Sequence, residues 1–269
     1  MNGKKIERRM KVLKKAIIIA SYGTTKAKAR EKSIEPFYQL FREVYDSTNV
    51  IQAYTSRYVR EKMKEENKCI LSPMEAIQAM IEEGCDSIYI QPTHILPGHE
   101  YHRILEAIEE VGKQNKKLSI YLGNPLLSDE NDMKDILYIL KKQYTFEQKN
   151  TTYILLGHGT DHDAHDQYAK MEEIAMNLGY PLIMGTIEDG VEEVIKKLGG
   201  LQVDKVELIP FLFVAGDHVI NDMMGHGQSW KNALEAAKYS VTCHPIGLGE
   251  LEEIRHYYLE QFKSKFSNM

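Results

Sequence analysis

The sequence predicts an α/β protein of two similar halves, each with a parallel β-sheet flanked by helices, and an active-site cleft between the halves. Short strands rich in β-branched residues alternate with amphipathic helices along its 269 residues, which is typical of parallel sheets with right-handed crossovers. Residues 86–100 also align without a gap to residues 204–218, with Asp, Pro and Gly at matching positions and Glu100 opposite His218. This internal repeat predicts halves at residues 1–132 and 133–269, whose strand-end loops line a shared cleft.

The overall charge excludes one broad class of partner. The chain has 34 basic and 39 acidic residues and a net charge of −5, so no global positive field attracts nucleic acid or a membrane surface. We therefore expect no nucleic-acid or membrane partner, and an anionic ligand needs a local basic cluster. The cysteines Cys69, Cys85 and Cys243 form no CxxC pair, which favours neither a disulfide framework nor a thiolate zinc site.

The N-terminal segment resembles a signal peptide only superficially. A basic stretch up to Lys15 precedes an apolar run at residues 16–20, which is shorter than the roughly 7–15 apolar residues of a signal peptide. No window approaches the roughly 18 apolar residues of a membrane span. Together with the unpaired cysteines, these patterns predict a cytoplasmic protein.

In the first half, the run from Lys15 to Ala20 predicts a strand that ends in the turn Ser21-Tyr22-Gly23-Thr24-Thr25. A threonine of this turn is a natural N-cap for the helix that follows. Periodicity and turn signals then predict strands at residues 51–54, 86–91 and 118–122, and helices at residues 58–66, 74–84 and 103–111.

The second half repeats this pattern after a turn-rich link that ends at Asp132. We expect strands at residues 153–156, 182–186, 206–213 and 240–245, and helices at residues 133–144, 171–178, 191–198, 230–237 and 251–266. The first of these strands stops abruptly at Gly157-His158-Gly159, so His158 lies where open α/β sheets place their ligands.

Three strand-end positions of the second half carry candidate metal ligands. His158, Glu188 and His218 each follow a different predicted strand, and the carboxyl ends of parallel strands meet at one edge of a sheet. Two imidazoles and one carboxylate suit cobalt, nickel, iron or zinc, and three protein ligands leave coordination positions open. Because histidine binds metal only as the neutral ring, metal uptake should strengthen as the pH rises through its titration.

A local histidine cluster competes with this convergent set. On a helix, His158, His162 and His165 would share one face, since they are spaced at i, i+4 and i+7. These side chains are then either the metal site, a feeder for cations or a solvated polar face. We interpret His226 as a loop residue.

Several motifs resemble those of the anaerobic sirohydrochlorin cobaltochelatases, class II tetrapyrrole chelatases of early-cobalt-insertion cobalamin biosynthesis. They are Ala20-Ser21-Tyr22-Gly23-Thr24, His94-Ile95-x-x-Gly98-x-Glu100-Tyr101, Leu156-Gly157-His158-Gly159-Thr160, and residues 210–223 with Ala215-Gly216-Asp217-His218-x-Ile220-Asn221-Asp222-Met223, followed by Ser229-Trp230-Lys231. The chain departs from the family pattern beside these motifs, at Asp163, His165, Gly225 and His226, which bears on metal preference more than on reaction type.

The resemblance implies a chelatase-like fold, insertion of Co²⁺ into sirohydrochlorin, and no organic cofactor. It implies that His158, Glu188 and His218 bind cobalt and that His158 is the base. Insertion removes two pyrrole N–H protons, so His158 and His218 are the candidate catalytic residues. The matching first-half loops make Ser21, Tyr22, Gly23, Thr24, His94 and Glu100 the candidate substrate-binding residues. The substrate's carboxylates would also suit a basic cluster of Lys26, Lys28, Arg30, Arg57 and Arg60.

Two further functions stay open at the level of sequence. Two histidines and a glutamate do not select among metals, so an Fe²⁺ or Ni²⁺ chelatase acting on sirohydrochlorin or a porphyrin is the first alternative. A protein that binds a metal or tetrapyrrole without turnover is the second, because the duplicated cleft resembles a binding-protein architecture. Homo-oligomer formation is compatible with the sequence.

Overall fold

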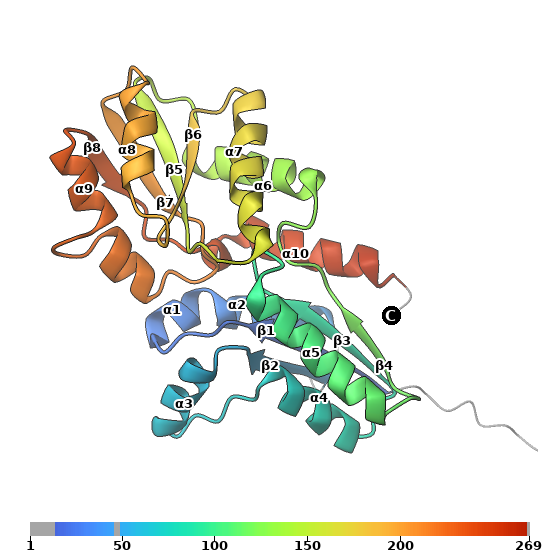
Figure 1. The fold of residues 1–269 in the computed structure, drawn as a ribbon. Helices are drawn as coiled ribbons and strands as arrows, with labels where there is room; N and C mark the ends of the chain where they lie inside the picture. The colour runs from blue at the N-terminus through green and yellow to red at the C-terminus, as the bar shows by residue number, and fades with distance from the viewer. Residues whose placement is uncertain (1–13, 46–48, 268–269) are drawn as a thin grey trace, which may run out of the picture.

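Two four-stranded parallel β-sheets form the framework of the protein (Figure 1). The computed structural model describes residues 14–45 and 49–267. The strand order is β2-β1-β3-β4 in the first sheet and β6-β5-β7-β8 in the second. The same order in both sheets confirms the predicted fold class of two similar α/β halves.

The first half contains β1 (Lys15–Ser21), α1 (Ala27–Lys32), α2 (Ile34–Val44), β2 (Val50–Tyr54), α3 (Arg57–Glu65), α4 (Pro73–Glu82), β3 (Ser87–Pro92), α5 (His99–Gln114) and β4 (Ser119–Leu122). The rest of the chain contains α6 (Glu130–Tyr144), β5 (Thr151–Gly157), η2 (Asp163–His165), α7 (Asp166–Asn177), β6 (Leu182–Thr186), α8 (Glu192–Gly199), β7 (Lys205–Pro210), η3 (Val219–Met223), α9 (Trp230–Ala236), β8 (Ser240–Cys243), η4 (Leu248–Glu250) and α10 (Glu252–Lys265).

The internal repeat extends to individual hydrogen bonds. The two prolines of the repeat occupy the same place, since Pro92 pairs with Ala20 and Pro210 pairs with Leu156. In both halves the residue after the proline makes the next bond to the central strand: the distance is 2.9 Å from Thr93 N to Ala20 O and 2.7 Å from Phe211 N to Leu156 O. The strand-end loops of both halves therefore leave their sheets at equivalent positions.

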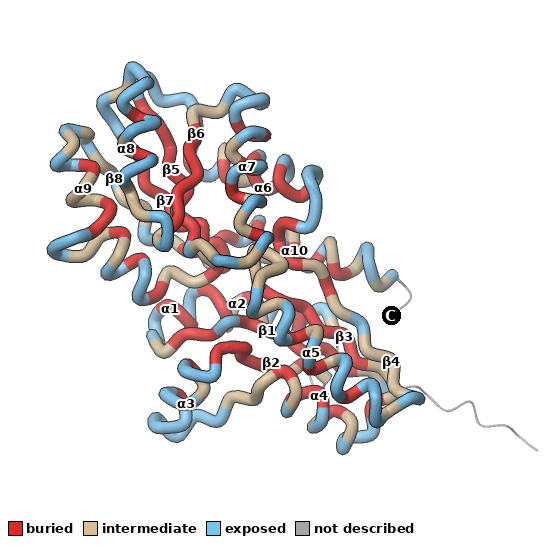
Figure 2. Tube along the Cα trace, in the orientation of Figure 1, coloured by how far each residue is buried: buried red, intermediate tan, exposed pale blue. Residues whose placement is uncertain are grey.

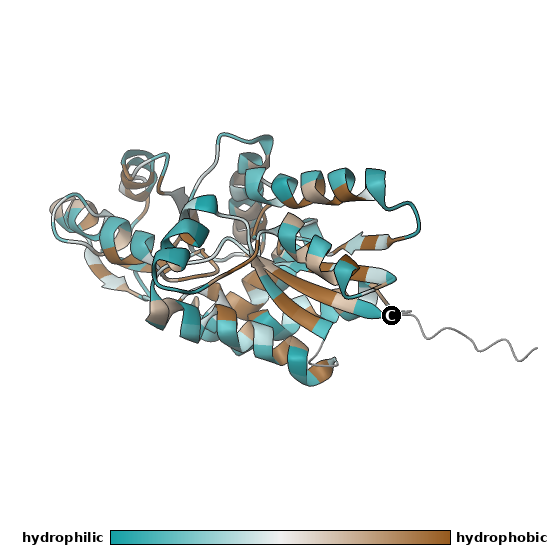
Figure 3. Cartoon of the chain, turned by 90° about the horizontal axis from the view of Figure 1, so that it is seen from below, coloured by the Kyte–Doolittle hydropathy of each residue, from teal (hydrophilic) through white to brown (hydrophobic). Residues whose placement is uncertain are grey.

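The inner strands β1, β3, β5 and β7 are buried on both faces, in keeping with their near-continuous apolar runs, while the edge strands β4 and β8 are partly exposed (Figure 2). One apolar cluster, which we call the shared core, contains residues of both halves, including Ile17 and Ile19 of β1 and Leu155 of β5. The outward faces pack into separate clusters, one around Ile18 and one around Ile154. Viewed by hydropathy, the strands are apolar and many helices carry a polar outer stripe (Figure 3).

The last helix crosses back onto the first half. Although α10 follows the last strand of the second sheet, the Tyr258 ring lies 5.4 Å from the Phe37 ring and the Phe262 ring lies 5.2 Å from the Phe41 ring. The Tyr258 hydroxyl also donates to the carbonyl oxygens of Thr93 and His94, at 3.0 and 3.1 Å. The division of the chain at residue 132 stays a prediction.

Some predicted boundaries were wrong for local reasons. Strand β7 ends at Pro210 rather than at residue 213. Helix α6 begins inside the predicted link, because Asp129 and Asp132 form a reciprocal capping box at its start. Helix α1 starts after Lys26, which has no side-chain cap, so the expected threonine N-cap was also wrong. Thr24 Oγ1 instead accepts a hydrogen bond from Lys26 N, at 3.1 Å.

Within the described ranges, none of the helices combines the length and the apolar character needed to cross a membrane.

Candidate active site

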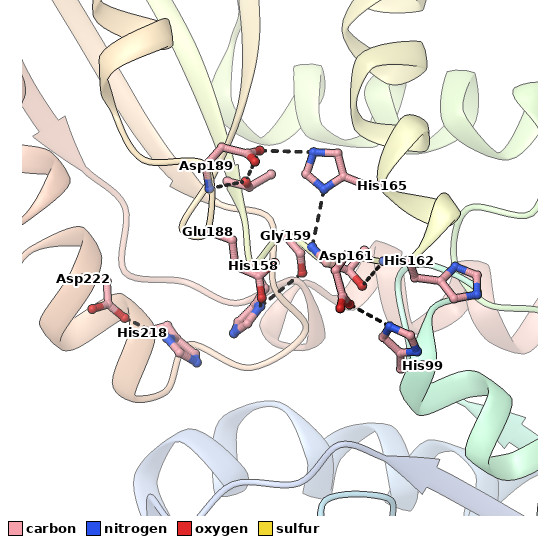
Figure 4. A network of polar contacts seen from close by, with 12 residues as sticks. His99, His158, Gly159, Asp161, His162, His165, Glu188, Asp189, His218 and Asp222 are labelled. Atoms are coloured by element: carbon pink, nitrogen blue, oxygen red, sulfur yellow. Dashed lines mark hydrogen bonds and ion pairs between the residues drawn. The ribbon is translucent and has the colours of Figure 1, made fainter.

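The three predicted metal ligands lie together at the carboxyl edge of the second sheet (Figure 4). His158 follows β5 directly, Glu188 lies two residues after β6, and His218 follows the loop after β7. The amide of Glu188 donates to the carbonyl oxygen of His158 at 3.0 Å, which ties the first two loops together. The convergence expected from three parallel strands is therefore present in the backbone.

The side chains approach one another without forming a closed metal cage. The rings of His158 and His218 lie 4.6 Å apart at 84°, and His158 Nδ1 lies 3.4 Å from Glu188 Oε1. All three side chains are close to half exposed. Among residues 14–45 and 49–267, no three His, Cys, Asp or Glu side chains are arranged to hold a metal ion as they stand. The ligand assignment stays a prediction.

Glycine at position 159 keeps the loops of His158 and Glu188 close. Gly159 has a φ of +94°, and a Cβ there would lie 2.7 Å from Glu188 Cβ and 3.0 Å from Thr186 Oγ1. Only glycine adopts this backbone without strain and leaves room for the neighbouring loop. The second glycine of the Gly-His-Gly motif is thus explained by the approach of β6.

The histidines that follow His158 do not join it on a helix face. His165 Nε2 lies 3.1 Å from Asp189 Oδ2, and His162 Nδ1 accepts a hydrogen bond from Ala164 N at 3.0 Å. Helix α7 starts only at Asp166, after the three-residue turn η2. The spacing argument for one helical face was therefore wrong, and Figure 4 shows the three side chains pointing in different directions.

His162 belongs instead to a contact between the two halves. Its ring lies 5.1 Å from the ring of His99 and 4.8 Å from the ring of His102, both on α5. His99 Nε2 lies 2.7 Å from Asp161 Oδ1, and this hydrogen bond lowers the pKa of Asp161. The loop that carries His158 is thus tied to the start of α5.

The first-half loop at residues 21–24 faces the second half. A Cβ on Gly216 would lie 3.4 Å from Thr24 Oγ1, and a Cβ on Gly23, which has a φ of +94°, would lie 2.5 Å from the ring of Tyr54. Tyr22 is 51% exposed, so its ring is free to contact a ligand. Ser21 is 1% exposed.

Three polar atoms near the end of the first sheet are buried without a hydrogen-bond partner among the described residues: Ser21 Oγ, His94 Nδ1 and Glu100 Oε2. His94 Nε2 lies 3.3 Å from Thr55 Oγ1, and burial lowers the pKa of His94 to about 4. The other carboxylate oxygen of Glu100 accepts from Arg103 at 2.5 Å. Buried polar groups normally have hydrogen-bond partners, so water or a polar group of a ligand would satisfy these three atoms.

The proposed basic cluster does not form one surface. Arg30 is buried, with its guanidinium 3.4 Å from Met63 Sδ, and Arg60 donates to the carbonyl oxygens of Tyr54 and Thr55. Lys26 Nζ lies 2.9 Å from Asp217 Oδ1 of the other half, and this hydrogen bond raises the pKa of Lys26. The sequence could not distinguish these internal roles from solvent exposure.

Two carboxylates of the site were not predicted to act there. Asp222 Oδ2 lies 2.7 Å from His218 Nδ1, and Asp189 accepts a hydrogen bond from Thr186 Oγ1 at 2.5 Å in addition to its contact with His165. The sequence signals for Asp222 are its place in the motif at residues 215–223 and its position four residues after His218, and neither indicates a contact between the two side chains.

The fold and the site together define the class of protein: a chelatase-like α/β fold of two similar sheets, with a His-Glu-His group at the strand ends of the second. Solved structures of SirB share this fold. The protein from Bacillus subtilis with Fe³⁺ superimposes with a TM-score of 0.64 at 17% identity, over 95% of this chain and 97% of that chain. The cobalt complex from Bacillus subtilis subspecies spizizenii gives a TM-score of 0.60 at 15% identity, with the same coverage.

Sequence comparison identifies the family. A family model described as cobalt chelatase (CbiK) matches residues 15–267. The sirohydrochlorin cobaltochelatase of Salmonella typhimurium is 31% identical over 247 residues, which cover 90% of this chain and 93% of the relative. The sirohydrochlorin cobaltochelatase CbiKC of Nitratidesulfovibrio vulgaris is 27% identical over 252 residues, which cover 92% and 88%. The chain belongs to the cobalt chelatase (CbiK) family, which confirms the resemblance seen in its motifs.

Proposed function

We propose that this protein inserts Co²⁺ into sirohydrochlorin and that His158, Glu188 and His218 hold the metal during insertion. The observation that carries the proposal is the meeting of these three side chains at one sheet edge, in a chain that matches the cobalt chelatase family over residues 15–267. Both relatives described above are named for the same substrate and metal. The metal is a substrate here and leaves with the product.

The residue types suit the chemistry of insertion. Two pyrrole N–H protons must leave the macrocycle, and neutral imidazoles beside the metal are suitable acceptors near neutral pH. In this proposal the metal passes from His158 and His218 to the pyrrole nitrogens, and each imidazole accepts a pyrrole proton on the ring nitrogen that the metal has left. Glu188 balances the charge of the metal. Because three protein ligands leave open positions on a divalent first-row metal, the tetrapyrrole nitrogens can displace the protein ligands stepwise.

The first-half loops are the proposed wall for the macrocycle. Tyr22 offers an exposed ring for stacking, and backbone N–H groups of residues 21–24 are candidates to hold a carboxylate. His94 and Glu100 contribute buried polar atoms that lack a partner among the described residues.

A multiple-turnover assay under anaerobic conditions tests the function. Sirohydrochlorin absorbance is followed with Co²⁺, Fe²⁺ or Ni²⁺, each beside a protein-free reaction that measures spontaneous insertion. We expect turnover above that background, fastest with Co²⁺. Faster turnover with Fe²⁺ or Ni²⁺ would replace the cobalt assignment, and binding without turnover by any metal would identify a non-catalytic binding protein.

Single substitutions test the residues. We expect His158→Ala and His218→Ala each to lower turnover by about 10²–10⁴-fold, the usual contribution of a positioned acid–base group, while the fold is retained because both side chains are about half exposed. His256→Ala is the matched control, since His256 is exposed on α10. Near-normal turnover of either variant would remove that histidine from the site. Unchanged kinetics of Glu100→Gln would make Glu100 structural.

A further inference from the structure

The ring of His218 is oriented by a carboxylate from its own segment. Asp222 Oδ2 lies 2.7 Å from His218 Nδ1, a short distance typical of a charge-assisted hydrogen bond. The Asp222 side chain is 43% exposed. An ionised carboxylate can only accept, so the proton of the neutral ring must reside on Nδ1. The lone pair of His218 is then on Nε2, the nitrogen that remains for a metal.

The backbone holds the pair in this arrangement. His218 directly precedes the π-helix η3, and Asp222 lies within it. Val219 and Met223 of η3 are 1% and 0% exposed and pack in the outer cluster of the second half. The turn closes at Gly225, whose amide donates to Asn221 O at 3.0 Å and where a Cβ would lie 2.3 Å from the same oxygen. The buried side chains of Val219 and Met223 thus keep the carboxylate of Asp222 beside the imidazole of His218. π-Helical turns are frequent at functional sites.

Among the residues that the structure describes, no carboxylate outside the proposed ligand set bonds to the His158 ring. Its Nδ1 contacts the neutral carbonyl oxygen of Gly159 at 3.2 Å, and the charged group nearby, Glu188 at 3.4 Å, is itself a proposed metal ligand. A carboxylate that binds the metal cannot also orient the ring through the same oxygen. The two histidines therefore differ: the His218 ring has a carboxylate partner outside the proposed ligand set, and the His158 ring contacts a backbone carbonyl oxygen and the proposed ligand Glu188.

We propose that Asp222 is a positioning residue of the metal site, which keeps Nε2 of His218 directed at the substrate metal and strengthens His218 as a ligand. Carboxylate–histidine–metal arrangements orient the ring and increase its basicity toward the metal. Because Asp222 does not touch the metal, its charge acts through His218. This inference rests on the proposed function, since it requires His218 to bind the metal.

Binding of Co²⁺ without tetrapyrrole is the primary test. Loss of such a partner typically costs 10–100-fold in metal affinity, so we expect Asp222→Asn to raise the Kd for Co²⁺ by about that factor, measured by titration calorimetry. In turnover, the KM for Co²⁺ should rise while kcat with saturating metal changes little. Glu192→Gln is the matched control, because Glu192 lines the same open pocket of about 540 Å³ as Asp222 and loses the same charge.

The tautomer of His218 gives a second readout that needs no metal. Nitrogen-15 NMR of the imidazole should show the proton on Nδ1 in the wild type. The proton should stay there in Asp222→Asn, whose amide oxygen still accepts the hydrogen bond, and should redistribute to Nε2 in Asp222→Ala. Unchanged thermal unfolding of both variants would separate these effects from misfolding.

His218→Ala distinguishes a failure of the positioning role of Asp222 from a failure of the proposed metal ligand His218. If His218→Ala weakens Co²⁺ binding and Asp222→Asn binds as tightly as Glu192→Gln, the positioning role is overturned and the proposed function stands. If His218→Ala leaves Co²⁺ binding intact, the ligand assignment fails and the role of Asp222 fails with it. A wild-type ring protonated on Nε2 would also overturn the positioning role.

Discussion

At the scale of single residues, the strand-end histidines could be found from the sequence, but their partners could not. His158 and His218 stand out because each follows an apolar run that predicts a strand, and parallel strands end at one edge. Which nitrogen is free depends on Asp222 and Gly159, and hydrophobic periodicity carries no information about such contacts.

His94 makes the stability of the protein depend on pH. Burial lowers its pKa to about 4 in the folded chain from an ordinary value of 6.5, so between these values the unfolded chain binds a proton that the folded chain does not. The unfolding free energy therefore falls as the pH drops from 6.5 toward 4, by up to roughly 3 kcal/mol from this group. Denaturant unfolding at pH 7, 6 and 5 measures the effect.

His94→Gln should lose this part of the pH dependence and show a shallower decline than the wild type. His256→Gln, on an exposed face of α10, should decline as the wild type does. Parallel curves for the wild type and His94→Gln would contradict the assignment to His94.

Gly159→Ala should damage both stability and activity. The added Cβ would meet Glu188 Cβ at 2.7 Å at a φ of +94°, so we expect a loss of roughly 2–3 kcal/mol in unfolding free energy from backbone strain and displacement of the neighbouring loop. Because His158 and Glu188 shift, turnover should fall at least about tenfold.

Gly179→Ala provides the comparison for this substitution. Gly179 has a φ of +72°, with nothing within 4 Å of the added Cβ, so only the backbone penalty of about 1–2 kcal/mol remains, with normal turnover. Equal turnover of Gly159→Ala and Gly179→Ala would show that the loop contact does not position the site.

At the scale of helices and strands, all eight strands that the structure describes were predicted near their observed positions, because short β-branched runs bounded by turn signals indicate strands locally. The π-helix η3 was missed, because its five residues, with only Val219 and Met223 buried, are too few to establish a period. The crossing of α10 to the first half was also missed, because an amphipathic pattern shows that a face is buried and not which sheet buries it.

Tyr258→Phe tests how α10 supports the His94 loop. The hydroxyl donates to the Thr93 and His94 carbonyl oxygens, and its removal leaves buried acceptors without this donor, so we expect a loss of about 1–3 kcal/mol in unfolding free energy. Tyr138→Phe, on a side chain that is 53% exposed, should change stability by less than about 0.5 kcal/mol. Equal denaturation midpoints for both variants would contradict the contact.

At the scale of the whole molecule, the shared core couples the two halves. It contains residues of β1 and β5 and the aromatic residues of α10, among them Phe262. An apolar cluster of this kind makes unfolding of one half expose the surface of the other. We therefore expect one cooperative transition rather than two.

Phe262→Ala measures this coupling. Phe262 is 1% exposed, and its truncation should cost about 3–5 kcal/mol. Trp230, the single tryptophan of the chain, lies in the outer cluster of the second half, so its fluorescence reports that half, while circular dichroism reports both. Both signals should shift together in Phe262→Ala. A shift in circular dichroism with an unchanged Trp230 transition would show that the halves unfold independently.

The α/β class, the duplicated sheet and the positions of His158, Glu188 and His218 follow from patterns within short segments, because strand period, glycine turns and repeated motifs are local properties. Packing between distant segments decides the other features: Arg30 turns inward against Met63, His94 is buried against Thr55, and α10 returns to the first half. Such contacts join residues far apart in the chain and depend on the geometry of the assembled core, which no single segment encodes.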